Sequence, residues 1–157
     1  MRACSPFVRA CSPFLLILCA AALPSGREVA LTQQPGSGLE HQAAKLMASD
    51  IHAARKAHET PLLLVGSAPI GEGKTALFVQ VQSAVLCGSA GCSTSVFLPS
   101  AHGWKRVLDS VSGPIEVGTA MHDGMHDLIV DARDRWVWAG QAYRDTLPVP
   151  RALPIKP

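Results

Sequence analysis

A short cysteine loop, residues 87–92, constrains the fold of this chain more than any other feature. Its sequence is Cys-Gly-Ser-Ala-Gly-Cys, and it lies between two runs, 75–82 and 93–98, in which apolar and polar residues alternate. A period of two is typical of a β-strand with two different faces. The pattern therefore predicts two antiparallel strands joined by a loop that a disulfide closes. From the loop alone, a structural role and a chemical role both stay open.

The N-terminal residues 1–26 have the pattern of a secretory signal peptide. Arg2 and Arg9 come first, an apolar run at 14–22 follows, and small residues and Pro24 end the segment. The apolar run is too short to span a bilayer stably, which argues against the alternative of a permanent anchor. We expect cleavage after Ala22 and export to the periplasm.

Removal of the signal peptide leaves only two of the five cysteines, Cys87 and Cys92. In an oxidising compartment this pair is expected to form a disulfide. Closing so short a loop stabilises a fold by about 2 kcal/mol. A redox-active dithiol normally has the tighter C-x-x-C spacing at a helix N-terminus, whereas strands flank this pair. The favoured interpretation is a structural disulfide, with redox work as the alternative.

The mature chain is close to neutral in charge. Of 14 Lys and Arg residues two lie in the signal peptide, so 12 remain against 12 Asp and Glu, with no long charged run. Proteins that bind nucleic acid usually concentrate positive charge on one surface. This composition argues against nucleic acid as a partner.

A polar leader at 27–37, expected to be mobile, precedes a helix signal. Ser37 and Glu40 have the spacing of a capping box, and apolar residues then recur at helical spacing from Leu39 to Ala54. This predicts one amphipathic helix over about 38–57 that covers the sheet. The alternative is a helix face offered to a partner.

Residues 68–75 loosely match the phosphate-binding P-loop pattern. A P-loop leads into a helix, whose N-terminal amides hold the phosphates. Here an alternating run follows instead, so we interpret the segment as a glycine-rich hairpin turn.

Two further groups could bind a ligand or could simply be structural. His122, Asp123, His126 and Asp127 could bind a metal or serve an enzyme, but Asp123-Gly124 is a strong turn signal and favours a polar hairpin tip. Trp136 and Trp138 share one face of a strand, where packing is favoured over the stacking of a flat ligand or sugar.

The remaining runs complete an α+β prediction: an antiparallel meander sheet with one N-terminal helix packed on it. The expected domain is 38–146, followed by a proline-rich tail at 147–157 that either extends freely or lies along a partner. Pro114 places the strand at 114–118 at an edge of the sheet. Further strands are expected at 62–65, 94–98, 104–108, 128–130 and 136–138.

The sequence contains no G-x-S-x-G, H-E-x-x-H or C-x-x-C-H motif. We therefore assign no catalytic, cofactor-binding or metal-binding residues. A non-catalytic binding or accessory module is favoured over an enzyme, and the enzyme that remains conceivable would use the cluster at 122–127.

The cysteine loop and segments 71–73, 123–128 and 136–143 resemble a family of small exported bacterial domains. These domains carry a C-G-x-G-G-C-like loop and a closing W-x-W-x-G-x-x-Y segment, which Trp136 to Tyr143 match here. The chain departs from the pattern where Ala90 replaces a glycine and Met125 an aromatic residue, and the acidic residue after the first turn is missing. The family has no settled activity, so the resemblance implies the fold and the compartment.

As a whole, with its leader, helix and proline-rich tail, the chain resembles the small third subunits of membrane-bound quinohaem alcohol dehydrogenases from acetic acid bacteria. The resemblance implies a non-catalytic periplasmic accessory subunit that stabilises or assembles the large dehydrogenase subunit. The protein would have no cofactor of its own, because its partners would carry pyrroloquinoline quinone (PQQ) and haem c, and it would meet the membrane only through the complex. The alternative is a stand-alone ligand-binding or inhibitor module, similar to lysozyme inhibitors.

Overall fold

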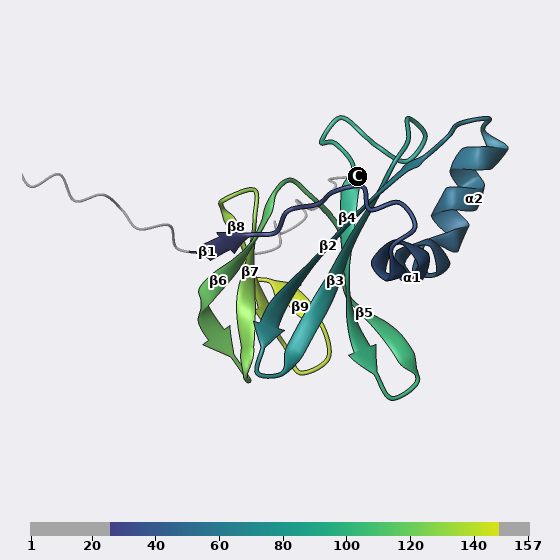
Figure 1. Cartoon of the computed structure of the whole chain (residues 1–157). Helices are drawn as coiled ribbons and strands as arrows, with labels where there is room; N and C mark the ends of the chain where they lie inside the picture. The colour runs from purple at the N-terminus through teal and green to yellow at the C-terminus, as the bar shows by residue number, and fades with distance from the viewer. Residues whose placement is uncertain (1–25, 148–157) are drawn as a thin grey trace, which may run out of the picture.

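The computed structural model describes residues 26–147 of the 157-residue chain (Figure 1). Apart from Gly26, the predicted signal peptide lies outside the described residues, as does the tail from residue 148 onward. Within 26–147, neither helix has the length and apolar character needed to cross a membrane.

The described part of the chain is an α+β domain with an antiparallel sheet, which confirms the predicted fold class. The helices are α1, Gly38–Leu46, and α2, Ala48–Lys56. The strands are β1 Gly26–Glu28, β2 Leu62–Gly71, β3 Lys74–Gln82, β4 Ser93–Ser100, β5 Gly103–Ser112, β6 Ile115–His122, β7 Met125–Val130, β8 Asp134–Trp138 and β9 Tyr143–Asp145.

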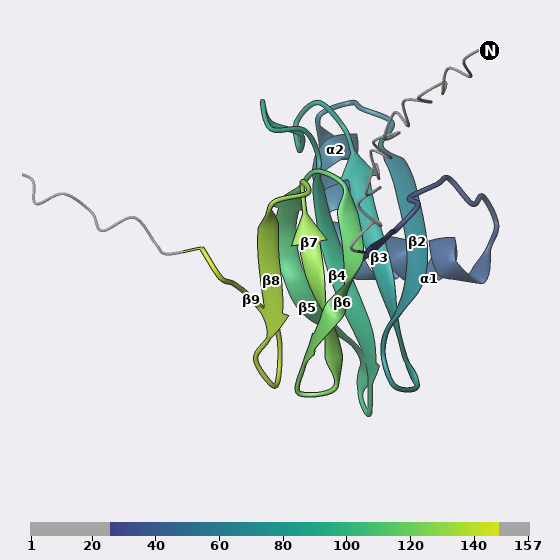
Figure 2. The ribbon, with the colours of Figure 1, turned by 90° about the vertical axis from the view of Figure 1, so that its left-hand side faces the viewer.

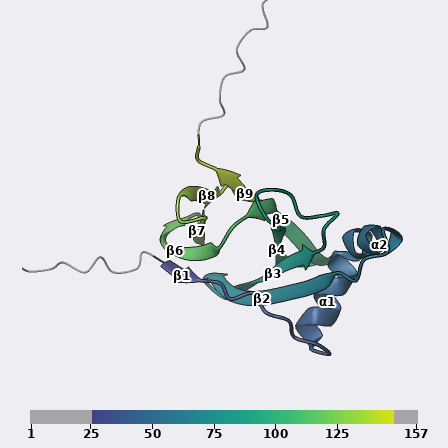
Figure 3. The ribbon, with the colours of Figure 1, turned by 90° about the horizontal axis from the view of Figure 1, so that it is seen from above.

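The sheet consists of two meanders that meet at a single residue pair. Strands β2 to β5 pair in order, and so do β6 to β9, whereas β2 and β7 pair only through Gly71 and Met125. A Cβ atom at Gly71 would lie 2.7 Å from the Gly124 carbonyl oxygen, so only glycine allows this close approach. Seen from above, the two meanders curl towards each other around a common interior (Figure 3).

Alternation along the strands fills two separate hydrophobic cores. On β3, Ala76 and Phe78 face the inner core between the meanders, whereas Leu77 and Val79 face the helices. Both sets are almost fully buried. The period-two pattern at 75–82 is therefore a strand with two buried faces, which explains why its apolar residues are so dense.

The single helix expected over 38–57 is instead two helices with a bend at Met47 (Figure 1). Met47 has φ −106° and ψ 22°, and its side chain is buried in the core beneath the helices. The bend lets α1 keep Ala43 on the sheet while α2 turns away and buries Ala54. The predicted cap is present, because Ser37 Oγ accepts from the Glu40 amide at 3.0 Å. Glu40 reaches back to the Gly36 amide, one residue before the expected partner.

The prediction of a mobile leader at 27–37, outside the domain, was wrong. Strand β1 pairs with β6, Val29 is buried in the inner core, and Thr32 exchanges two backbone hydrogen bonds with Val65 of β2. The leader thus connects β6 of one meander to β2 of the other. For the same reason β6 is not the edge strand that Pro114 suggested, since β1 covers its outer side.

Both predicted hairpin turns are confirmed. The P-loop-like segment ends in the tight turn at Glu72 and Gly73, and strand β3 follows it (Figure 2). Asp123 and Gly124, both with positive φ, form the turn between β6 and β7. Trp136 and Trp138 pack against the inner core, as the packing interpretation expected.

Candidate functional site

The cysteine loop closes as predicted, with a disulfide between Cys87 and Cys92. Inside the loop, Gly88 and Gly91 exchange two backbone hydrogen bonds of 3.1 and 3.0 Å. The residues from Gly88 to Gly91 are exposed. The loop is therefore a small cross-linked hairpin that projects from the connection between β3 and β4.

Apolar side chains are exposed at the same end of the molecule. Val85 is 53% exposed and precedes the cysteine loop, and Leu62, at the start of β2, is 45% exposed. Leu62 lies beside Gln82 in the register of β2 and β3, so the two apolar residues lie near the same strand ends. We call Leu62, Val85 and residues 87–92 the disulfide end.

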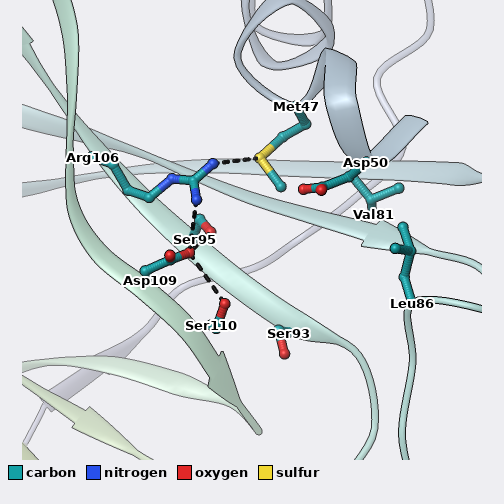
Figure 4. A pocket seen from close by; sticks show the side chains of 9 residues that line it. All are labelled: Met47, Asp50, Val81, Leu86, Ser93, Ser95, Arg106, Asp109 and Ser110. Carbon is teal, nitrogen blue, oxygen red and sulfur yellow. Dashed lines mark hydrogen bonds and ion pairs between the residues drawn. The ribbon is translucent and has the colours of Figure 1, made fainter. Parts of the chain in front are cut away.

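A pocket of about 200 Å³, which we call the joint pocket, opens beside this end (Figure 4). It lies between the α1–α2 bend and strands β3 to β5. Leu86 and Ser93, which flank the cysteine loop, form one of its borders. Its other lining residues are Met47, Asp50, Val81, Ser95, Arg106, Asp109 and Ser110.

Asp109 is the centre of the hydrogen bonds in the joint pocket (Figure 4). Its Oδ1 atom accepts from Ser95 Oγ at 3.0 Å, from Arg106 at 2.9 Å and from Ser110 Oγ at 3.2 Å. The Arg106 guanidinium also contacts Met47 Sδ at 3.7 Å, and it lies 5.2 Å from the centre of the Phe97 ring. The pocket walls are thus tied to one another and to the helix bend.

The surroundings of Asp109 lower the pKa of its carboxyl group. Partial burial raises this pKa, but the hydrogen bond from Ser95 and the charge and hydrogen bond of Arg106 outweigh it. A folded-state pKa below the ordinary value means that the ionised carboxylate stabilises the fold above the pKa of the unfolded state. That contribution is lost as the pH falls through the folded-state pKa.

We predict that Ser95→Ala raises the Asp109 pKa towards its ordinary value of 3.8. The reason is that the variant removes the hydrogen bond that contributes most to lowering the pKa. The check is a carboxyl ¹³C NMR titration, with Ser93→Ala as control because Ser93 lines the pocket without bonding Asp109. An unchanged Asp109 titration in Ser95→Ala would contradict the assigned cause.

The prediction of a polar hairpin tip at 122–127 is only partly correct, because Asp127 is buried. Asp127 lies in β7 and is 1% exposed. Its Oδ1 atom accepts from His122 Nδ1 at 2.6 Å, and its Oδ2 atom accepts from Arg135 Nε at 2.7 Å. The carboxylate therefore connects β6, β7 and β8 below the turn. Among the described residues, no three His, Cys, Asp or Glu side chains come together as metal ligands.

Tyr143 is the first residue of β9, and its hydroxyl donates a hydrogen bond to the carbonyl oxygen of His126 in β7 at 2.8 Å. Burial, together with the nearby charge of Asp127, raises the pKa of its phenol well above the ordinary value. The phenol therefore stays protonated and keeps donating at any physiological pH.

We predict that replacing Cys87 and Cys92 together with serine lowers the free energy of unfolding by about 2 kcal/mol, because the loop is no longer closed in the unfolded state. Urea denaturation of the mature protein measures the change, with Ser89→Ala inside the loop as control. Unchanged stability would show that the backbone hydrogen bonds of the loop are sufficient.

Comparisons of this chain with protein-family models, with curated proteins and with solved structures found no match. The two resemblances drawn from the sequence therefore stay predictions.

Proposed function

We propose that this protein is a non-catalytic periplasmic accessory subunit that stabilises or assembles a membrane-bound quinoprotein alcohol dehydrogenase complex. The larger subunits of that complex would carry PQQ and haem c. The observation that carries the proposal is the disulfide end, where exposed apolar side chains lie beside a projecting, cross-linked loop.

The disulfide end has two properties that favour stable association. Val85 and Leu62 offer apolar area that becomes buried when a partner covers them. The cross-link between Cys87 and Cys92 limits the conformations of the loop before binding. A preordered loop loses less conformational entropy in a complex than a free loop does.

The joint pocket adds fixed polar groups next to this apolar surface. Asp109 remains 55% exposed although its Oδ1 atom accepts three hydrogen bonds, and Arg106 remains 37% exposed. These groups are positioned by bonds within the fold and can still meet a partner. An apolar centre with polar groups at its border is the usual composition of a protein interface.

The test is purification of the native protein from membranes under mild detergent. We expect a larger subunit with the absorption of haem c and the fluorescence of extracted PQQ to co-purify. Val85→Glu is expected to reduce the co-purified amount strongly. Met121→Glu is the matched control, because Met121 is 48% exposed but lies on β6 towards the opposite end.

Recovery of a lone soluble monomer from native cells would contradict the proposal and favour the stand-alone ligand-binding or inhibitor module. Equal co-purification of both variants would show that the partner surface lies elsewhere than the disulfide end.

A further inference from the structure

A second cavity is lined by residues of three hairpins, β2–β3, β4–β5 and β8–β9. The turns of these hairpins lie at the end of the molecule opposite the cysteine loop (Figure 1). Its volume is about 320 Å³. We call it the hairpin cavity. Its side-chain lining includes Lys74, Leu98, Lys105, Val107, Trp138 and Gln141.

The floor of the hairpin cavity is apolar and belongs to the inner core. Leu98 and Val107 are buried there, and Trp138 packs against the same core. The Trp138 ring meets Tyr143 edge-on, with 5.3 Å between the ring centres and 71° between the planes. Tyr143 is itself held by its hydrogen bond to the His126 carbonyl oxygen, so the indole packs against an anchored neighbour.

The rim of the hairpin cavity is cationic. Lys74 and Lys105 come from two different hairpins, and Lys105 Nζ donates to Gln141 Oε1 at 3.1 Å. That bond keeps the Lys105 ammonium group near the third hairpin. The lining residues, all within 26–147, include two lysines and no carboxylate.

We propose that the hairpin cavity binds a small organic anion with a flat apolar body, an aromatic carboxylate in chemical class. The ring would lie on the apolar floor beside Trp138, and the carboxylate would meet the ammonium groups of Lys74 and Lys105. Cavities that bind small molecules typically have about 300–1,000 Å³, a mainly apolar lining and a few placed polar groups. This site is separate from the disulfide end, so it does not depend on the proposed partner.

The experiment is a titration of the mature protein with 2-naphthoate, followed by ¹⁵N–¹H NMR. We expect saturable shifts of the Trp138 indole N–H and the Gln141 side-chain amide. Three comparison probes test separately whether binding needs the negative charge and the aromatic ring. Acetate has the charge without the ring, 2-naphthamide has the ring without the charge, and inorganic phosphate is a compact anion. Each should bind at least tenfold more weakly.

Lys74→Gln combined with Lys105→Gln is expected to weaken 2-naphthoate binding about tenfold, because each exposed ion pair contributes modestly. Lys56→Gln on α2, which also removes one exposed lysine, should leave binding unchanged. Naphthoate shifts elsewhere but not at Trp138 would overturn the proposal. Equal binding of 2-naphthamide, or of the double lysine variant, would also overturn it.

Discussion

An Asp127→Ala variant is expected to lose about 3 kcal/mol of unfolding free energy, because it removes a buried carboxylate and leaves the Arg135 guanidinium and the His122 ring without their acceptor. Asp127 is 1% exposed and accepts from both His122 and Arg135. The side chains of His122 and Arg135 are 44% and 45% exposed, so water recovers part of the loss. The expected value therefore lies at the lower end for a broken buried ion pair.

Urea denaturation of the mature protein measures this loss. Asp131→Ala is the matched control, since Asp131 also pairs with an arginine, Arg133, but on the surface. Exposed pairs of this kind contribute little, so the control should lose about 1 kcal/mol at most, part of it the cost of alanine at the positive φ of residue 131. If both variants were equally stable, the contacts of Asp127 would not stabilise the arrangement of β6, β7 and β8.

Gly66→Ala is expected to destabilise the fold by about 2 kcal/mol, the usual cost of overpacking. A Cβ atom at this position would lie 2.5 Å from the Ala30 carbonyl oxygen. That oxygen belongs to the backbone of the leader, which must therefore shift. The shift would disturb the burial of Val29 and the two hydrogen bonds between Thr32 and Val65.

Two measurements test the Gly66 prediction. Urea denaturation gives the stability, and trypsin cleavage at Arg27 reports whether the leader has come away from the sheet. Gly38→Ala is the control, because a Cβ atom at Gly38 would meet nothing within 4 Å. Unchanged stability and unchanged cleavage in Gly66→Ala would mean that the leader is not held where it crosses β2.

Local patterns in the sequence were sufficient to predict strands β2 to β8 and the two hairpin turns, but not β1 or β9. The alternation at 75–82 predicts β3 because a strand repeats its faces every two residues. The dipeptide Asp123-Gly124 predicts its turn because both residues can take positive φ. The pairing of the two cysteines could be predicted from their spacing and from the expected oxidising compartment.

Features that depend on distant partners could not be predicted in this way. From the sequence, Asp127 was predicted to lie in a hairpin tip. Its buried position could not be seen there, because it depends on Arg135, a residue of the next strand. The bend at Met47 depends on how the two helices pack on the sheet. Strand β5 extends beyond the expected residue 108 through Asp109 and Ser110, residue types that strands disfavour.

The joint pocket was missed for the same reason. Asp109 fell beyond the predicted strand, so nothing related it to Arg106 or Ser95. The leader was misjudged because Val29 and Leu31 are too few to produce a periodic signal. Their burial follows from the folded arrangement, in which the leader pairs first with β6 and then with β2.

The leader's path from β6 to β2 has a consequence for the predicted export of this protein. If the predicted cleavage after Ala22 holds, only residues 23–25 separate the new N-terminus from β1. While the signal peptide is still held in the membrane, the chain before β1 would be too short to let β1 pair with β6. The two meanders could then form separately, but the leader would pair with β6 and β2 only after it is released. Processing by the signal peptidase would thus act as the last step of folding.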